Sequence, residues 1–315
     1  MKKLFFNKET AEKIADEYGT PFYIYDAEGI KNAVRELRGA FSWADFKEYY
    51  AVKACPNPYI LSIIKDSGGG VDCSSYTELL LAKACGFKGE DVMFSSNVTP
   101  AEDFEAARSL SAIINLDDIT HIEFLEKHGG IPEEICLRYN PGGDFSISGA
   151  IMGNPGEAKY GMTGEQIIKA VGILLEKGVR SFGLHAFLAS NMLGDDYWPA
   201  LSEVLLELAL RVKRETGVVV SFINLSGGIG IPYKPDEKPV DMSVILKRTA
   251  LSTDISSTRR RDARRRGLFP SPSSAISTAT SSSAMARRLP LRPGTRNRRR
   301  SATSRRTSRI PRIRM

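Results

Sequence analysis

The sequence predicts an α/β protein, a (β/α)8 barrel of the TIM type in which seven βα units can be recognised. Short apolar runs alternate with helical patterns along most of the chain, which is typical of a parallel sheet. No Gly-x-Gly-x-x-Gly fingerprint follows the first strand, and seven units occur in succession. Both observations favour a closed barrel over an open, doubly wound sheet of seven strands, which is the alternative.

The predicted elements follow one another at regular intervals. The seven strands are expected at residues 46–53, 70–74, 91–95, 112–116, 135–139, 181–185 and 221–225. Helical patterns begin at Pro58, Tyr76, Pro100, Asp117, Thr163 and Asp196. An eighth unit would begin near residue 255, where these patterns have stopped. Residues 19–25 precede the barrel, and we interpret them as a strand of another element, which the family resemblance given below implies is an incomplete all-β domain.

The net charge of +7 averages two unlike parts of the chain. Residues 249–315 hold 18 Arg and no Lys against 2 Asp and no Glu, whereas residues 1–248 hold 26 Lys and Arg against 35 Asp and Glu. The tail is rich in Ser and Thr and has a single aromatic residue, Phe269, so it cannot bury enough apolar surface to offset its ordering entropy. The complete switch from Lys to Arg favours a shift of reading frame near residue 249 over a natural basic tail.

We therefore divide the chain into three parts. Residues 1–25 are the strand segment of the β-domain, residues 26–248 are an incomplete barrel, and residues 249–315 are a disordered tail. No apolar run approaches the length of a membrane span, and the opening residues do not form a signal peptide. We expect a cytoplasmic protein without a metal site, because none of the four cysteines, Cys55, Cys73, Cys85 and Cys136, has CxxC spacing or a nearby histidine.

Polar residues gather where the predicted strands end, which is where a barrel opens its active site. Lys53 ends the first strand, and a partly desolvated amine there is a nucleophile toward carbonyls, including the aldehyde of pyridoxal phosphate. A solvated lysine that caps the strand is the plainer interpretation of this segment alone. The other residues at strand ends, which together indicate a site, are Asp72, Ser74, Asn97, Asp117, Asn140, His185 and Ser226.

A glycine-rich loop, Ser226-Gly227-Gly228-Ile229-Gly230, follows the seventh strand. Closely spaced glycines let backbone N–H groups converge on an anion, and barrels commonly bind phosphate at this position, although a tight turn is an alternative. His185 could stack on a planar ring or move a proton, or it could be a buried, hydrogen-bonded histidine. An amine, an imidazole and a phosphate loop around one mouth fit an aldehyde phosphate cofactor.

Residues 20–235 resemble the fold-type III pyridoxal-phosphate-dependent amino-acid decarboxylases, and most closely the diaminopimelate decarboxylases. The matching segments, in the order of the family, are residues 21–26, 50–54, 70–75, 138–141, 159–161, 185–191 and 226–231. The resemblance implies that pyridoxal phosphate binds Lys53 covalently, that His185 stacks on its ring, and that Ser190, Gly227 and Gly228 hold its phosphate. The other cofactor-binding residues that it implies are Asp72, Asn140 and Gly230.

The resemblance implies decarboxylation of meso-diaminopimelate to L-lysine and CO2, in lysine biosynthesis, by a homodimer. The chain departs from the family at Asn191, which stands in place of a glutamine, and at Ser226, which stands in place of a glycine. The Glu-Pro-Gly-Arg and Cys-Glu-Ser segments of the family, its late tyrosine and its C-terminal β-domain are not found, so we expect impaired activity.

Three other functions are compatible with the sequence. One is a non-catalytic barrel that binds pyridoxal phosphate, although the expected strand before the barrel argues against it. Another is a decarboxylase of ornithine, arginine or carboxynorspermidine. The last is a nucleic-acid binder that uses the basic tail, but the tail lacks interleaved aromatic residues and any recognisable module. We expect neither nucleic acid nor a membrane as a partner.

Overall fold

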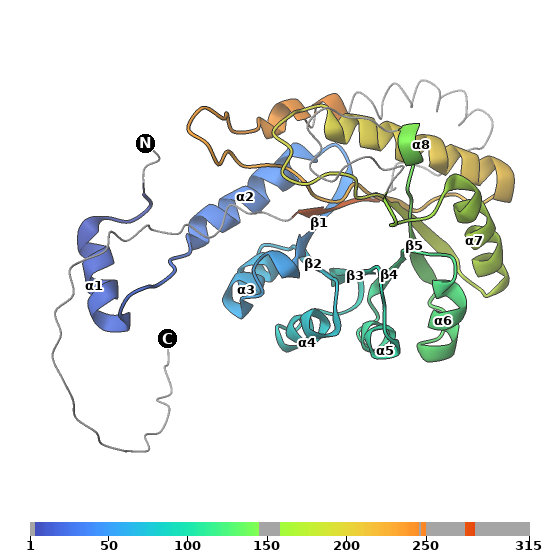
Figure 1. Ribbon diagram of the computed structural model, residues 1–315, viewed down its shortest axis with the longest axis horizontal. Coiled ribbons are helices and arrows are strands. Elements are labelled where there is room, and N and C mark those ends of the chain that lie inside the picture. The colour runs from blue at the N-terminus through green and yellow to red at the C-terminus, as the bar shows by residue number, and fades with distance from the viewer. Residues whose placement is uncertain (1–3, 145–157, 246, 250–274, 281–315) are drawn as a thin grey trace, which may run out of the picture.

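A closed barrel of parallel strands forms the centre of the computed structural model (Figure 1). The structure describes residues 4–144, 158–245, 247–249 and 275–280. The predicted α/β barrel is confirmed, and each of the seven expected strands is present. The strands are β1 (Asp45–Ala51), β2 (Gly70–Cys73), β3 (Val92–Ser96), β4 (Ile113–Leu116), β5 (Glu134–Arg138), β6 (Ser181–His185), β7 (Phe222–Asn224) and β8 (Ala275–Thr280).

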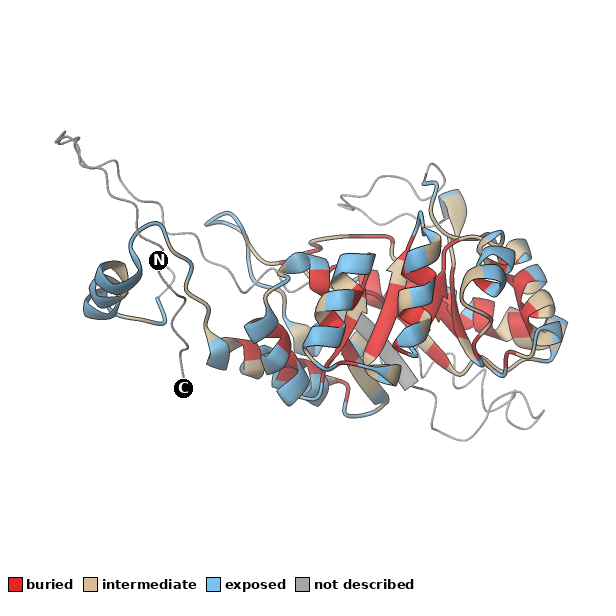
Figure 2. Cartoon of the chain, turned by 90° about the horizontal axis from the view of Figure 1, so that it is seen from below, coloured by how far each residue is buried: buried red, intermediate tan, exposed pale blue. Residues whose placement is uncertain are grey.

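Helices cover the outside of the barrel and turn their apolar faces to the strands, as the burial pattern in Figure 2 shows. They are α2 (Ala27–Ala40), α3 (Pro58–Asp66), α4 (Tyr76–Ala84), α5 (Ala101–Ser109), α6 (His121–His128), α7 (Gly164–Glu176) and α8 (Tyr197–Thr216). Local sequence sets their ends. Asn57 accepts a hydrogen bond from the amide of Tyr59 at the start of α3, and Thr163 and Gln166 form a capping box at the start of α7.

A layer of side chains fills the barrel beneath its mouth. Tyr49, Met93, Cys136 and Phe222 pack together with Ile113. The first four come from β1, β3, β5 and β7, which is the layered arrangement of alternate strands expected in such barrels. A Cβ atom on Gly183 would lie 2.1 Å from the ring of Phe222, so the aromatic plug requires a glycine at that position of β6. The plug closes the interior and leaves the carboxyl ends of the strands to hold a ligand.

The expectation that the eighth strand is missing is wrong. Strand β8 pairs in parallel with β1 over six residues and with β7 over three. Without β8, β1 and β7 would each present an unpaired edge. The sequence of β8 contains isoleucine and threonine, which are common in strands. The strand was overlooked because its surroundings are rich in Arg and Ser. The rest of the predicted tail, residues 250–274 and 281–315, lies outside the described residues.

The segment before the barrel differs from the prediction. Residues 8–18 form a helix, α1 (Lys8–Tyr18), which buries none of its residues and lies away from the barrel in Figure 1. Residues 19–25 form no strand, because no partner strand lies beside them in the part of the chain that the structure describes. The all-β domain therefore stays a prediction.

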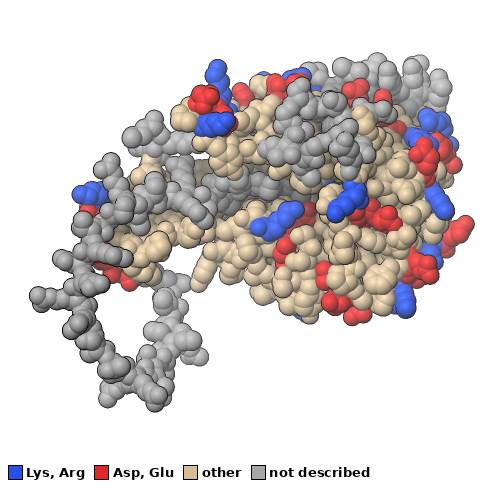
Figure 3. Space-filling view, in the orientation of Figure 1, with Lys and Arg blue, Asp and Glu red and all other residues tan. Residues whose placement is uncertain are grey.

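Two further features of the described residues bear on the alternatives. None of their helices has the length and apolar character needed to cross a membrane. Acidic and basic side chains alternate over the face of the barrel seen in Figure 3, without a continuous basic stripe among the residues coloured there.

Candidate active site

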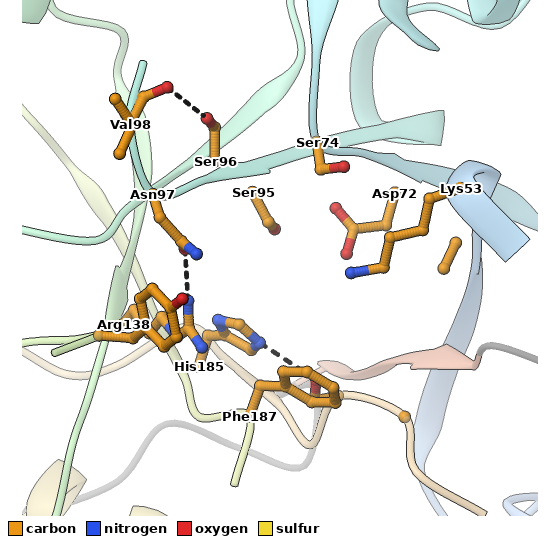
Figure 4. Close-up of a pocket in the computed structure, with 14 residues that line it drawn as sticks. Lys53, Asp72, Ser74, Ser95, Ser96, Asn97, Val98, Arg138, His185 and Phe187 are labelled. Carbon is orange, nitrogen blue, oxygen red and sulfur yellow. Dashed lines mark hydrogen bonds between the residues drawn. The ribbon is translucent and has the colours of Figure 1, made fainter. Parts of the chain in front are cut away.

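A cavity of about 450 Å³ opens at the carboxyl ends of the strands (Figure 4). Its walls combine side chains from the loops and strand ends of β1, β2, β3, β5, β6 and β7. The lining residues are Ala51, Lys53, Asp72, Ser74, Ser95, Ser96, Asn97, Val98, Arg138, Tyr160, His185, Phe187, Ser226 and Gly227. The cavity thus lies where a barrel places its active site.

Lys53 supplies the amine of the site. Strand β1 ends at Ala51, and Lys53 follows it in a short 3₁₀ turn, η1 (Val52–Ala54), rather than on the strand as predicted. Its Nζ lies 5.7 Å from the centroid of the Phe187 ring, and Figure 4 shows the side chain extending into the cavity beside Asp72. The exposed amine is accessible to a ligand in the cavity.

Asp72 has one carboxylate oxygen that is buried in the wall without a partner. Its Oδ1 makes no hydrogen bond in the structure, and neither does the hydroxyl of Ser95, which lines the same wall. Burial raises the pKa of Asp72 to about 7, against the opposing effects of the nearby Ser95 hydroxyl, which does not reach hydrogen-bond geometry, and of the Lys53 charge. A buried acceptor of this kind suits a polar ligand in the cavity.

His185 is buried between two hydrogen-bond partners. Its Nδ1 lies 2.7 Å from Nδ2 of Asn115, and its Nε2 lies 3.3 Å from Oγ of Ser226. Burial, and then the positive charges of Arg138 and Lys53, lower the pKa of His185 well below its ordinary value. The imidazole is therefore neutral. A neutral ring can face a planar ligand without placing a positive charge against it.

Arg138 is a buried cation that the sequence interpretation did not include in the site. One of its terminal nitrogens donates to Asp117 at 2.7 Å and to Asn97 at 2.6 Å, and its guanidinium lies 5.2 Å from the ring centroid of Tyr160. A buried arginine is stable only when it is paired in this way. The available signal was its position near the end of the fifth strand, since Lys53 and His185 were predicted as site residues from the same kind of position on other strands.

Two loops are joined behind the cavity floor. The amide of Met192 donates to the carbonyl of Gly228, and the amide of Gly230 donates to the carbonyl of Met192. Gly228 has φ +108°, and a Cβ atom there would lie 2.8 Å from the carbonyl oxygen of Ala189. The glycines therefore allow the loop after β7 to pack against the loop after β6, which brings Ser226 and Gly227 to the cavity.

The predicted site residues divide into two groups. Lys53, Asp72, His185 and Gly227 line the cavity, whereas Asn140, Ser190, Gly228 and Gly230 are not among its lining residues. Of the latter, Asn140 donates from its amide to the carbonyl of Tyr160 and so supports the loop that carries that ring. Ser190 belongs to the loop after β6, next to the bonds made by Gly228 and Gly230. Their direct contact with a cofactor stays a prediction.

The donor set of the cavity fits pyridoxal phosphate. An amine can bind the aldehyde, a buried carboxylate oxygen lacks a partner, a neutral imidazole lines the wall, and a glycine-rich loop follows β7. A metal ion fits less well, because no group of three His, Cys, Asp or Glu side chains in the described ranges could hold one.

The barrel and this donor set define a class, that of enzymes which bind pyridoxal phosphate at a barrel mouth. The family model described as the pyridoxal-binding domain of pyridoxal-dependent decarboxylases matches residues 27–261. The chain belongs to this family, so the resemblance and the cofactor inferred from the sequence are confirmed. The match covers strands β1 to β7 and the residues that line the cavity, and it ends before β8.

Individual relatives agree with this assignment. Protein TabA of Pseudomonas amygdali pv. tabaci is 34% identical over 232 residues, which cover 74% of this chain and 54% of the relative. The diaminopimelate decarboxylase of Methanothermobacter thermautotrophicus is 30% identical over 239 residues, which cover 74% of this chain and 55% of the relative. The chain therefore spans about half the length of the curated relatives that it matches.

A solved structure supports the fold independently. The diaminopimelate decarboxylase of M. jannaschii, in complex with L-lysine, superposes with a TM-score of 0.74 at 22% sequence identity. The superposition covers 87% of this chain and 64% of that one. At this identity the likeness establishes the barrel, and the substrate has to be argued from the site.

Proposed function

We propose that the chain carries the cofactor site of a pyridoxal-phosphate-dependent decarboxylase that converts meso-diaminopimelate to L-lysine and CO2. The observation that carries the proposal is the juxtaposition of Lys53, Asp72 and His185 in one cavity at the barrel mouth. Asp72 and His185 come from β2 and β6, and Lys53 follows β1 in the turn η1, so the barrel brings together residues that are far apart in the sequence. The proposed enzyme is a cytoplasmic homodimer.

The chain's own residues hold and orient the cofactor. Lys53 is the covalent attachment point, the neutral His185 ring lies along one side of the cavity, and the loop at Ser226 and Gly227 holds the phosphate. Asp117 fixes Arg138 in the wall, where its charge helps to keep His185 neutral. When bound, pyridoxal phosphate supplies the electron sink that makes loss of CO2 possible.

The choice of substrate is supported by the named relatives. Diaminopimelate decarboxylases from several archaea match the chain, with identities of 30% for the Methanothermobacter thermautotrophicus and Thermoplasma acidophilum proteins. A relative from Niallia circulans that decarboxylates an L-glutamyl acyl-carrier protein also matches, at 27%. Decarboxylation is thus the shared reaction, and ornithine, arginine and carboxynorspermidine are the competing substrates that an experiment must include.

Release of CO2 by the purified chain tests the proposal. The chain is supplied with excess pyridoxal phosphate and, separately, with meso-diaminopimelate, ornithine, arginine or carboxynorspermidine. We expect slow turnover of meso-diaminopimelate above all others, and none by the Lys53→Ala variant. Preferred turnover of another amino acid would refute the substrate, and activity that survives Lys53→Ala would refute the site.

A further inference from the structure

The buried polar residues around His185 form a continuous row from strand β4 to the loop after β7. Asn115 on β4 contacts His185 at the end of β6, and His185 contacts Ser226, which lines the cavity. All three residues are buried, with exposed fractions of 4% each. Hydrogen bonds between buried groups are electrostatically stronger than those exposed to water, so their direction matters to the groups that they join.

The direction of each bond follows from the groups that make it. In the structure Nδ2 of Asn115 faces the ring and Oδ1 is buried without a hydrogen-bond partner. Because an amide nitrogen can only donate, this orientation makes Nδ1 of His185 the unprotonated acceptor. The single proton of the neutral ring is then on Nε2, which faces Oγ of Ser226 at 3.3 Å. The oxygen of Ser226 therefore accepts a hydrogen bond from the ring, and its own hydroxyl proton is left to point elsewhere.

The backbone of Ser226 keeps that hydroxyl at the cavity. Ser226 has φ +60°, in the left-handed region that few non-glycine residues adopt. Its amide donates to Oδ1 of Asn224 at 2.7 Å, a contact that stabilises the turn. Because Gly227 follows immediately and also lines the cavity, the Ser226 hydroxyl lies at the head of the glycine-rich loop.

We propose that Asn115, His185 and Ser226 form a directed hydrogen-bond chain that presents the Ser226 hydroxyl proton to an anionic group in the cavity. Asn115 is a positioning residue in this chain, since it sets the tautomer of His185 and touches no ligand itself. The identification of the anion with the phosphate of pyridoxal phosphate rests on the proposed function. The direction of the hydrogen bonds does not, and it can be tested without any cofactor.

Nitrogen NMR of the full chain labelled with 15N-histidine tests the direction. The sequence contains only three histidines, so His121 and His128 serve as internal references, and a His185→Gln variant assigns the remaining signals. We expect His185 to be neutral and protonated on Nε2. The Asn115→Asp variant, which places an acceptor opposite Nδ1, should move the proton to that nitrogen. A wild-type ring protonated on Nδ1 would overturn the proposal.

A double-mutant cycle tests the consequence for the anion. Asn115→Leu and Ser226→Ala should each weaken pyridoxal phosphate binding by roughly fivefold to tenfold, which corresponds to about one buried hydrogen bond. The double variant should bind no more weakly than Ser226→Ala alone, because both changes remove the same donor. Binding of pyridoxal, which has no phosphate, should be unaffected. Additive losses, or equal losses for pyridoxal, would contradict the chain.

The two tests separate the possible failures. If the tautomer is as expected and the variants bind pyridoxal phosphate normally, then the anion is not held by Ser226 and this inference is wrong, while the decarboxylase proposal stands. If neither form of the cofactor binds the wild-type chain, the proposed function itself is wrong. Native-like circular dichroism of each variant is required before its affinity is compared.

Discussion

Individual residues at the barrel mouth owe their chemistry to burial. Burial shifts both Asp72 and His185 toward the form without charge: it raises the pKa of Asp72 to about 7 and lowers that of His185 well below its ordinary value. Asp117 pairs with the buried guanidinium of Arg138. The mouth therefore combines an ion pair with two groups whose pKa values are shifted by burial.

The raised pKa of Asp72 predicts a specific dependence of stability on pH. Its ordinary value of 3.8 applies to the unfolded chain, and the value in the fold is about 7. The folded chain therefore holds more protons between these values, so the free energy of unfolding falls as pH rises through them. Relative to Asp72→Asn, the wild-type chain should lose about 2–3 kcal/mol between about pH 5 and pH 8.

Urea unfolding of both chains without cofactor at the two pH values measures this difference. His185 contributes with the opposite sign: its pKa is lowered in the fold, so its contribution to the free energy of unfolding is lost as pH falls. Because both chains contain His185, this contribution cancels in the comparison. A wild-type stability that stays parallel to that of Asp72→Asn across the range would show that the carboxyl is not held protonated.

At the scale of elements, the joined loops after β6 and β7 are the part of the site that depends most on backbone conformation. Gly228→Ala would strain both the positive φ and the contact with Ala189, so we expect a loss of about 1–3 kcal/mol in stability and weaker pyridoxal phosphate binding. Gly172→Ala, on an open face of α7, is the matched control and should be neutral or slightly stabilising. Equal thermal melting of the two variants would contradict the role given to this loop.

The elements show what could be predicted from the sequence. Alternating apolar runs located seven strands, and polar residues at their ends located Lys53, Asp72 and His185. Pattern alone could not find Asn115, because its partner His185 is 70 residues away in the sequence and meets it only in the folded barrel. Asn140 was predicted to bind the cofactor, but in the structure it donates to the carbonyl of Tyr160 and supports a loop. A position at the end of a strand does not determine the direction of the side chain.

The closure of the barrel is the main lesson at the scale of the whole molecule. Composition predicted no structure after residue 249, yet β8 completes the ring by backbone hydrogen bonds with β1 and β7. Such pairing needs few apolar side chains, because it joins the backbone N–H and C=O groups along the edges of β1 and β7. Composition is therefore a weak guide to a single closing strand.

Two truncations test that role. Removal of residues 250–315 takes away β8 and should leave the six paired residues of β1 unsatisfied, giving aggregation on size-exclusion chromatography and a lower melting temperature. Removal of residues 281–315 keeps β8 and should leave the melting temperature unchanged. Equal behaviour of the two truncated chains would show that β8 does not hold the barrel closed.

The central claim, that the barrel mouth binds pyridoxal phosphate through Lys53, is tested most directly by covalent trapping. The full chain is incubated with pyridoxal phosphate, reduced with borohydride and mapped by peptide mass spectrometry. Lys47 lies in the same strand, β1, and is paired with Asp91, so Lys47→Ala is the matched control. We expect the label on Lys53 in the wild-type and Lys47→Ala chains and no label at the site in Lys53→Ala. A label on another lysine, with Lys53 unmodified, would contradict the account.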